Sequence, residues 1–160
     1  MSVAKVLKMI KDKEVKFVDL RFTDTKGKWQ HTAQTASTIN ESTFKEGIMF
    51  DGSSIAGWKN INESDMILMP DPNTAVIDPF TAQPQMILFC DVIEPSDGKP
   101  YELDPRSTGK KAEEYLVKSG IGEKCFFGPE AEFFVFDDVK WATDQEYTFF
   151  SIDSEEGAYN

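Results

Sequence analysis

The stretch Val15-Lys-Phe-Val-Asp-Leu-Arg-Phe-Thr-Asp-Thr-Lys-Gly-Lys28 contains the signals that decide the fold of the N-terminal part. Within it, residues 15–22 alternate between two sets of side chains, which is the period-two pattern of a β-strand. Asp24-Thr-Lys-Gly27 follows as a turn signal, and residues 28–33 can return as the second arm of a hairpin. We therefore predict a β-hairpin close to the N-terminus.

Short helices and strands surround this hairpin. Ser2 can cap a helix whose apolar residues begin at Val3 and recur at helical spacing. Further along, the pattern predicts a helical turn that ends at Gly47, a loop over residues 49–58, and strand-like apolar runs at residues 65–69, 74–77 and 85–93. The first hundred residues thus predict an α+β domain of mostly antiparallel strands.

A turn-rich segment, Glu94-Pro-Ser-Asp-Gly-Lys-Pro100, is the predicted linker between a domain of residues 1–100 and a second domain of residues 101–160. Beyond the linker we predict a helix over residues 108–118 that stops at Gly120, and strands over residues 126–139 and 147–152. A helix and two strands cannot cover both faces of a sheet. We therefore expect the second domain to be incomplete and the chain to be part of a longer protein.

Composition and charge exclude several classes of function. The 160 residues include 17 Lys and Arg against 28 Asp and Glu, which gives a net charge of -11. Such a chain repels phosphate backbones and anionic lipids, so neither nucleic acid nor a membrane surface is an expected partner. Cys90 and Cys125 form no metal-binding spacing, and His31 is the single histidine. With no apolar stretch of membrane-spanning length and no signal peptide, a cytoplasmic location is expected.

Two glutamates form the sharpest local motif, Gly128-Pro-Glu-Ala-Glu-Phe-Phe-Val-Phe136. In a strand, Glu130 and Glu132 would point to the same face, roughly 6.5–7 Å apart. Flanking phenylalanines favour a buried strand, in which two carboxylates need a positive partner. Mg²⁺ or Mn²⁺ would satisfy them, as would a shared proton or an Arg or Lys. The alternative is an edge strand whose glutamates reach solvent.

A second candidate site is the glycine-containing stretch Phe50-Asp-Gly-Ser-Ser-Ile-Ala-Gly-Trp58. Its glycines let the backbone approach a ligand, and Asp51 places a carboxylate beside two hydroxyls, one of them that of Ser54. This chemistry suits a small cation or a proton that must be removed. The alternative is a turn in which Asp51 and the serines bond to their own backbone.

Other polar residues have mainly structural interpretations. Arg106 can clamp a phosphate or carboxylate, or form an ion pair at the domain junction. His31 lies in a predicted hairpin arm, where a half-buried structural histidine is the commoner outcome. Asp65 precedes an apolar run and is predicted to lie in a turn or loop, and Lys110-Lys111 is predicted to be a solvated helix face.

Taken together, these motifs closely resemble the N-terminal part of bacterial type I glutamine synthetases. Besides the opening stretch, the resemblance is carried by Met49-Phe-Asp-Gly-Ser-Ser-Ile55, Gly57-Trp58, Ile61-Asn-Glu-Ser-Asp-Met66, Thr74-Ala-Val-Ile-Asp-Pro-Phe80, Asp104-Pro-Arg-Ser107, Phe127-Gly-Pro-Glu-Ala-Glu-Phe-Phe134 and Glu155-Glu-Gly-Ala-Tyr-Asn160. It covers nearly the whole chain. It implies a β-grasp-like N-terminal domain followed by the start of the α+β catalytic domain.

The resemblance also implies a reaction and an assembly. Members of the family form glutamine from glutamate, ammonium and ATP, through γ-glutamyl phosphate, and use two divalent metal ions, Mg²⁺ or Mn²⁺, at each active site. Adjacent subunits share the active site in a homododecamer of two stacked hexameric rings. The resemblance thus predicts a ligase of nitrogen metabolism.

The resemblance also implies roles for individual residues, through their match to the family motifs. Glu130 and Glu132 resemble ligands of the two metal ions, one each. Asp51 resembles the residue that binds ammonium and takes its proton, with Ser54 nearby. Asp65 and Trp58 match positions on the surface that bridges subunits. Since the family's other ligands lie beyond residue 160, we expect this chain alone to be inactive.

Two rival functions remain open at this point. A β-grasp-like module could serve assembly or regulation without catalysis, with its exposed apolar surface capped by a partner. A γ-glutamyl-polyamine ligase would keep the Glu-x-Glu strand, but we expect it to lack the Asp51 loop because its amine nucleophile differs. The presence of Asp51-Gly-Ser-Ser54 argues against this second rival.

Overall fold

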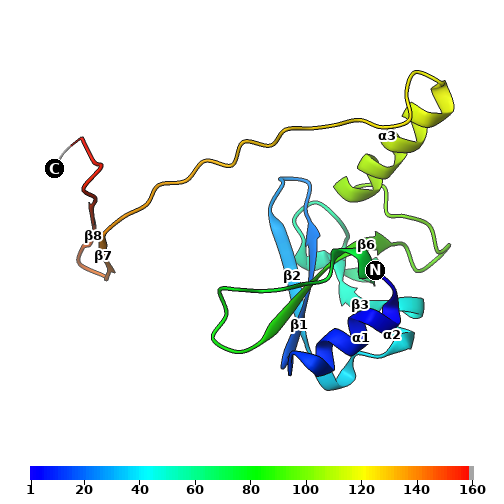
Figure 1. Ribbon diagram of the computed structural model, residues 1–160, viewed down its shortest axis with the longest axis horizontal. Helices are drawn as coiled ribbons and strands as arrows, with labels where there is room; N and C mark the ends of the chain where they lie inside the picture. The colour runs from blue at the N-terminus through cyan, green and yellow to red at the C-terminus, as the bar shows by residue number, and fades with distance from the viewer. Residues whose placement is uncertain (159–160) are drawn as a thin grey trace. The chain divides into compact units, whose positions relative to one another are not determined.

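The computed structural model describes residues 1–158 (Figure 1). Tyr159 and Asn160, the last residues of the resemblance, lie outside the described residues. The chain divides into two compact units, Met1–Lys124 and a second that starts at Cys125, and each is described by itself.

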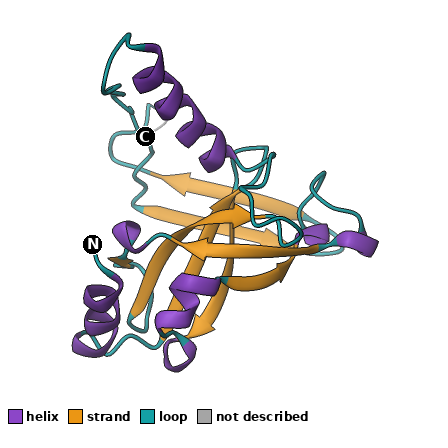
Figure 2. Ribbon diagram, turned by 90° about the vertical axis from the view of Figure 1, so that its right-hand side faces the viewer, coloured by secondary structure: helices purple, strands orange, loops and turns teal. Residues whose placement is uncertain are grey.

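The first unit contains a mixed sheet with two short helices packed on one face (Figure 2). Its strands follow the order β2-β1-β6-β4-β3, and β5 also pairs with β6; β1 runs parallel to β6 and the other pairs are antiparallel. The elements are α1 (Val3–Asp12), β1 (Phe17–Thr23), β2 (Trp29–Thr35), α2 (Glu41–Glu46), β3 (Ile48–Asp51), β4 (Asp65–Pro70), β5 (Val76–Ile77), β6 (Gln85–Ile93) and α3 (Pro105–Ser119).

The predicted N-terminal elements are confirmed. Strand β1 pairs with β2 from Phe17 opposite Thr35 to Thr23 opposite Trp29, which is the expected hairpin. Ser2 caps α1 by accepting a hydrogen bond from the Lys5 amide. The core lies between the sheet and helices α1 and α2, where alternate apolar residues of β1 and β6 meet the apolar face of α1.

The opposite face of β1 carries a charged cluster. Asp19 is buried and accepts hydrogen bonds from Arg21 Nε at 2.7 Å, while His31 Nδ1 lies 2.6 Å from its other oxygen. Arg21 also donates to Asp78 at 3.2 Å. The His31 side chain is 63% exposed, so the prediction of a half-buried histidine was wrong although its role in the hairpin is structural.

Two predicted element boundaries were wrong. Residues 49–51 belong to β3 rather than to a loop, because they pair with β4 and thereby satisfy their backbone groups. Helix α3 begins at Pro105 instead of residue 108, because Asp104 caps it and proline suits the first helical position. The predicted stop at Gly120 is confirmed, with that glycine in the left-handed conformation.

Gly47 tests how closely the chain packs against strand β4. Its φ of +76° favours glycine, and a Cβ there would lie 2.3 Å from Ile67 Cγ2 and 2.7 Å from the Leu68 carbonyl oxygen. We expect Gly47→Ala to lower the free energy of unfolding by about 3 kcal/mol in urea titrations. Gly98→Ala is the matched control, since Gly98 has a φ of +67° and open space around it. Equal losses in the two variants would show that the close approach to β4 is absent.

The second unit contains an antiparallel hairpin of β7 (Asp138–Thr143) and β8 (Thr148–Asp153). The predicted strand over residues 126–139 was wrong over most of its length: residues 124–136 have no regular secondary structure, and only Asp138 and Val139 lie in a strand, β7. Strand-like composition alone does not produce a strand, because the backbone N–H and C=O groups of a strand must pair with those of a neighbouring strand. Within residues 1–158 no strand pairs with this segment. Its phenylalanines are consequently exposed. None of the helices within residues 1–158 has the length and apolarity needed to cross a bilayer.

Candidate active site

The loop that carries Asp51 leaves the edge of the sheet. Asp51 is the last residue of β3 and lies opposite Asp65, the first residue of β4, so Asp65 belongs to a strand rather than to the predicted turn. A single 3-10 turn, Gly52–Ser54, follows at once. The Gly52 amide donates to the Ser64 carbonyl at 2.7 Å, which closes the base of the loop.

Asp51 is an exposed, ordered carboxylate. One of its oxygens accepts hydrogen bonds from the Ser53 amide at 2.9 Å and the Ser53 hydroxyl at 2.7 Å. Hydrogen bonds from the Ser53 hydroxyl and amide, and from the Ser64 hydroxyl, lower the pKa of Asp51 below its ordinary 3.8. The turn in which Asp51 bonds to the backbone of its own loop is therefore present. It holds the carboxylate ionised at neutral pH while leaving it open to solvent, so it does not conflict with cation binding.

Close packing beneath the loop explains why position 52 is a glycine. A Cβ on Gly52 would lie 2.4 Å from Sδ of Met66, a fully buried residue of β4. The backbone of the loop can therefore lie directly on the core. Ser54, the other predicted ammonium-site residue, is exposed and lies in the same 3-10 turn as Gly52.

Trp58 anchors the far end of the loop in the core. Only 6% of Trp58 is exposed, and its ring lies 5.6 Å from that of Phe22 and 5.1 Å from that of Tyr101. The expectation that Trp58 lies on a surface was therefore wrong, because a large aromatic ring gains more by filling the core. Tyr101 donates its hydroxyl to the Trp58 carbonyl at 2.8 Å. Sequence reasoning missed Tyr101, which lies far from the loop in the chain.

Glu130 and Glu132 lie in the second unit, on the exposed segment without regular structure. Neither carboxylate has a hydrogen bond or ion pair within residues 1–158, so both are free to bind a cation. Their oxygens are ligands that Mg²⁺ and Mn²⁺ accept. No group of three or more His, Cys, Asp and Glu side chains forms a metal cluster in the described part of the chain. The pair fits a divalent ion in its chemistry and supplies part of a coordination shell.

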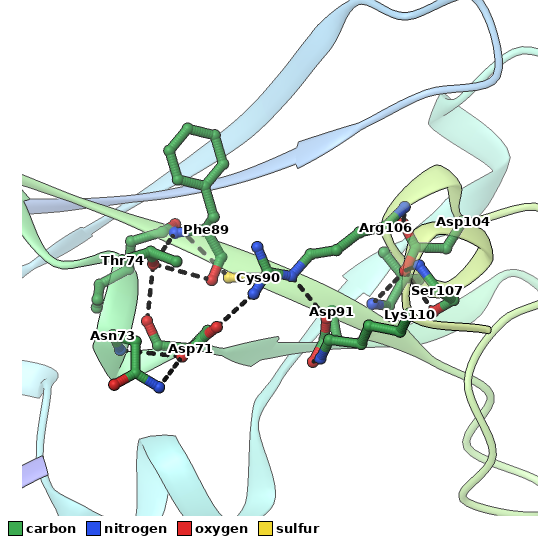
Figure 3. A network of polar contacts seen from close by, with 12 residues as sticks. Asp71, Asn73, Thr74, Phe89, Cys90, Asp91, Asp104, Arg106, Ser107 and Lys110 are labelled. Atoms are coloured by element: carbon green, nitrogen blue, oxygen red, sulfur yellow. Dashed lines mark hydrogen bonds and ion pairs between the residues drawn. The ribbon is translucent and has the colours of Figure 1, made fainter. Parts of the chain in front are cut away.

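The junction between the sheet and α3 is held by ion pairs (Figure 3). Arg106 Nε lies 2.8 Å from Asp91 of β6, and its Nη2 pairs with Asp71. Lys110 adds a contact to Asp91 at 2.5 Å, so the predicted solvated face of Lys110-Lys111 is partly engaged. Asp104 is fully buried and bonds the first turn of the helix. Of the two interpretations of Arg106, the ion pair at the junction is the one found.

Two protein-family models match the chain. The family model described as glutamine synthetase, beta-Grasp domain, matches residues 14–95, and that described as glutamine synthetase, catalytic domain, matches residues 102–160. The chain belongs to the glutamine synthetase family. Its fold is the expected β-grasp domain followed by the start of the catalytic domain.

Two curated relatives match nearly the whole chain. The glutamine synthetase of Azospirillum brasilense is 59% identical over 158 residues, which are 99% of this chain and 34% of that protein. A Cupriavidus pinatubonensis protein named 3-hydroxylaminophenol mutase is 56% identical over 159 residues, again 99% of this chain and 34% of the relative. The chain thus spans about a third of the length of these curated relatives.

Solved structures share the fold. A cryo-electron microscopy structure of Plasmodium falciparum glutamine synthetase matches with a TM-score of 0.71 at 23% sequence identity, over 98% of this chain and 30% of that one. At this identity the match supports the fold alone.

Proposed function

We propose that the natural protein is an ATP-dependent ligase that forms L-glutamine from L-glutamate and ammonium. The observation that carries this proposal is the ionised, exposed Asp51 carboxylate, which Ser53 holds by two hydrogen bonds at the start of a 3-10 turn in a glutamine synthetase β-grasp domain. A negative charge at this point attracts ammonium and can accept its proton, which the reaction needs before nitrogen can attack.

The proposed reaction has two steps. An oxygen of the glutamate γ-carboxylate attacks the terminal phosphorus of ATP, and ADP leaves, which gives γ-glutamyl phosphate. Ammonia then attacks the γ-carbonyl carbon, and inorganic phosphate leaves with the carboxylate oxygen. In this scheme Asp51 converts ammonium to ammonia by taking one proton, and Ser54 lines the ammonium site beside it.

Glu130 and Glu132 are the proposed ligands of two Mg²⁺ or Mn²⁺ ions, one each. Both carboxylates lack partners within residues 1–158, and oxygen donors suit either ion. When bound, such ions neutralise the phosphate charges and orient the transferring phosphoryl group. The exposed phenylalanines that flank the glutamates are suited to pack against further structure and to exclude water from the ions.

The proposed working form is a cytoplasmic homododecamer of two stacked hexameric rings. In it residues 1–100 form the β-grasp domain, residues 101–160 begin the catalytic domain, and the Asp51 loop completes the active site of an adjacent subunit. Residues 1–160 by themselves are expected to be inactive, because two carboxylates and one loop do not hold ATP and glutamate. Measurable glutamine formation by the 160 residues alone would refute that expectation.

The experiment that tests the proposed function is an assay of the natural protein with glutamate, ammonium, ATP and Mg²⁺. We expect glutamine and phosphate to form in equal amounts, and no product when any one substrate is omitted. Absence of glutamine with a correctly folded protein would instead favour a role in assembly or regulation. Conversion of 3-hydroxylaminophenol in place of glutamine formation would assign the activity for which the Cupriavidus pinatubonensis relative is named.

A further inference from the structure

Tyr101 links the Asp51 loop to the junction at which the match to the catalytic domain begins. Its hydroxyl donates to the carbonyl of Trp58, the residue that ends the loop in the core, at 2.8 Å. Tyr101 is 8% exposed, and its ring packs at a tilt of 59° against the indole of Trp58. Burial raises the pKa of the Tyr101 hydroxyl, which therefore keeps its proton and donates at neutral pH.

A series of backbone hydrogen bonds runs through the loop to Trp58. The Ile55 amide donates to the Gly52 carbonyl at 3.2 Å, and the Trp58 amide donates to the Ile55 carbonyl at 3.1 Å. A shift of Trp58 is therefore passed back to Gly52, which directly follows Asp51. The position of the Asp51 carboxylate depends on both ends of the loop, and Tyr101 holds the distal end.

Tyr101 is itself held to strand β6. Its amide donates to the Val92 carbonyl at 2.8 Å, and the Asp104 amide donates to the Tyr101 carbonyl at 3.2 Å. The Asp104 carboxylate caps α3 and accepts a further bond from the Val92 amide at 3.4 Å. Arg106 fastens the same helix to Asp91, the strand residue beside Val92 (Figure 3). The segment that carries Tyr101 is thus attached to β6 on both sides.

We propose that Tyr101 is a positioning residue that makes the Asp51 loop and the start of α3 one rigid body. It does not touch a substrate; it acts through the Trp58 carbonyl. The consequence for catalysis rests on the proposed function, in which Asp51 receives ammonium. The start of the catalytic domain then sets where the ammonium-binding carboxylate lies.

Tyr101→Phe in the natural protein tests the proposal, because it removes one hydroxyl and keeps the ring in the core. The Trp58 carbonyl is then left without its donor. We expect amide hydrogen exchange of residues 52–58 to accelerate about fivefold, as loss of one hydrogen bond implies. We also expect the KM for ammonium to rise about fivefold while the KM for ATP stays unchanged, since the displaced group is the ammonium carboxylate.

Two control variants separate this effect from others. Tyr115→Phe makes the same chemical change on α3, where the side chain is 71% exposed and has no hydrogen bond within residues 1–158. Ile39→Val removes one methylene from a buried core residue outside the junction, and so reports general destabilisation. Neither variant is expected to alter loop exchange or the KM for ammonium selectively.

Each outcome decides a separate point. Loop exchange in Tyr101→Phe equal to that in Tyr115→Phe would overturn the link between Tyr101 and the loop. Faster exchange with an unchanged KM for ammonium, in a protein that makes glutamine, would overturn the positioning role. If the natural protein makes no glutamine, the proposed function fails, and loop exchange still decides whether Tyr101 holds the loop.

Discussion

Replacing Glu130 or Glu132 by glutamine is expected to reduce glutamine formation by about a hundredfold or more and to raise the Mg²⁺ or Mn²⁺ concentration needed for half-maximal rate. The amide retains the size and one oxygen of each side chain but loses the negative charge that holds a divalent ion. Since both glutamates lack partners within residues 1–158, the loss cannot be attributed to a broken ion pair there. Steady-state rates over a metal titration measure both effects.

Glu123→Gln is the matched control for this prediction. Glu123 is an exposed glutamate close before the same segment, so its substitution changes the net charge equally. We expect its rate and metal requirement to equal those of the unmodified protein. If Glu130→Gln and Glu132→Gln also behave in this way, neither glutamate is a metal ligand and the proposed assignment is wrong.

Asp51→Asn is expected to reduce kcat/KM for ammonium by about a hundredfold while leaving ATP binding intact. Asparagine keeps a side-chain oxygen for the Ser53 amide, so the turn is preserved, but it can neither attract ammonium by charge nor accept its proton. Because the pKa of Asp51 is lowered below 3.8, the native carboxylate is ionised throughout the neutral range. The rate of the native protein therefore falls through Asp51 protonation only as the pH drops below that value.

Asp97→Asn provides the comparison for Asp51. Asp97 makes the same kind of turn, accepting from the Lys99 amide at 3.0 Å, and it is likewise exposed. Its substitution is expected to leave kcat/KM for ammonium unchanged. An Asp51→Asn protein with unchanged ammonium kinetics would remove Asp51 from the proposed role, whatever the effect of Asp97→Asn.

Local sequence signals predicted the N-terminal hairpin and most of the individual strands of the first unit. The turn at Asp24 works because its carboxylate accepts from the amides of Lys26 and Lys28 and from Gln30, all within six residues. Such interactions can be inferred from neighbouring residues alone. The sheet order, with β1 parallel to β6, depends on contacts between distant segments and was not predicted. The family resemblance supplied only the β-grasp class of the fold.

The segment around Glu130 shows where local reasoning failed. Its alternating apolar residues have high strand propensity, yet the strand does not form without a neighbour within residues 1–158. An alternating apolar pattern therefore shows that a segment is able to form a strand, but the strand forms only where a neighbouring strand pairs with its backbone.

For the candidate site, the sequence indicated which side chains could carry chemistry, but it did not indicate the contacts that hold the Asp51 loop in place. Loop composition indicated a carboxylate, Asp51, beside two hydroxyls, and the resemblance placed Ser54 near it. The alternative of a turn in which Asp51 bonds to its own backbone is present in the structure. Tyr101 and Asp104 were missed because their partners are distant in sequence or belong to the backbone. A tyrosine hydroxyl that bonds a carbonyl has no sequence signature.

The most direct test of the central claim follows the oxygen of the glutamate γ-carboxylate. The natural protein would be given glutamate labelled with ¹⁸O in that group, together with ammonium, ATP and Mg²⁺, and the phosphate released would be examined by mass spectrometry. Formation through γ-glutamyl phosphate predicts that each phosphate carries one labelled oxygen for each glutamine formed. Unlabelled phosphate, or glutamine formed without ATP, would contradict the proposed reaction.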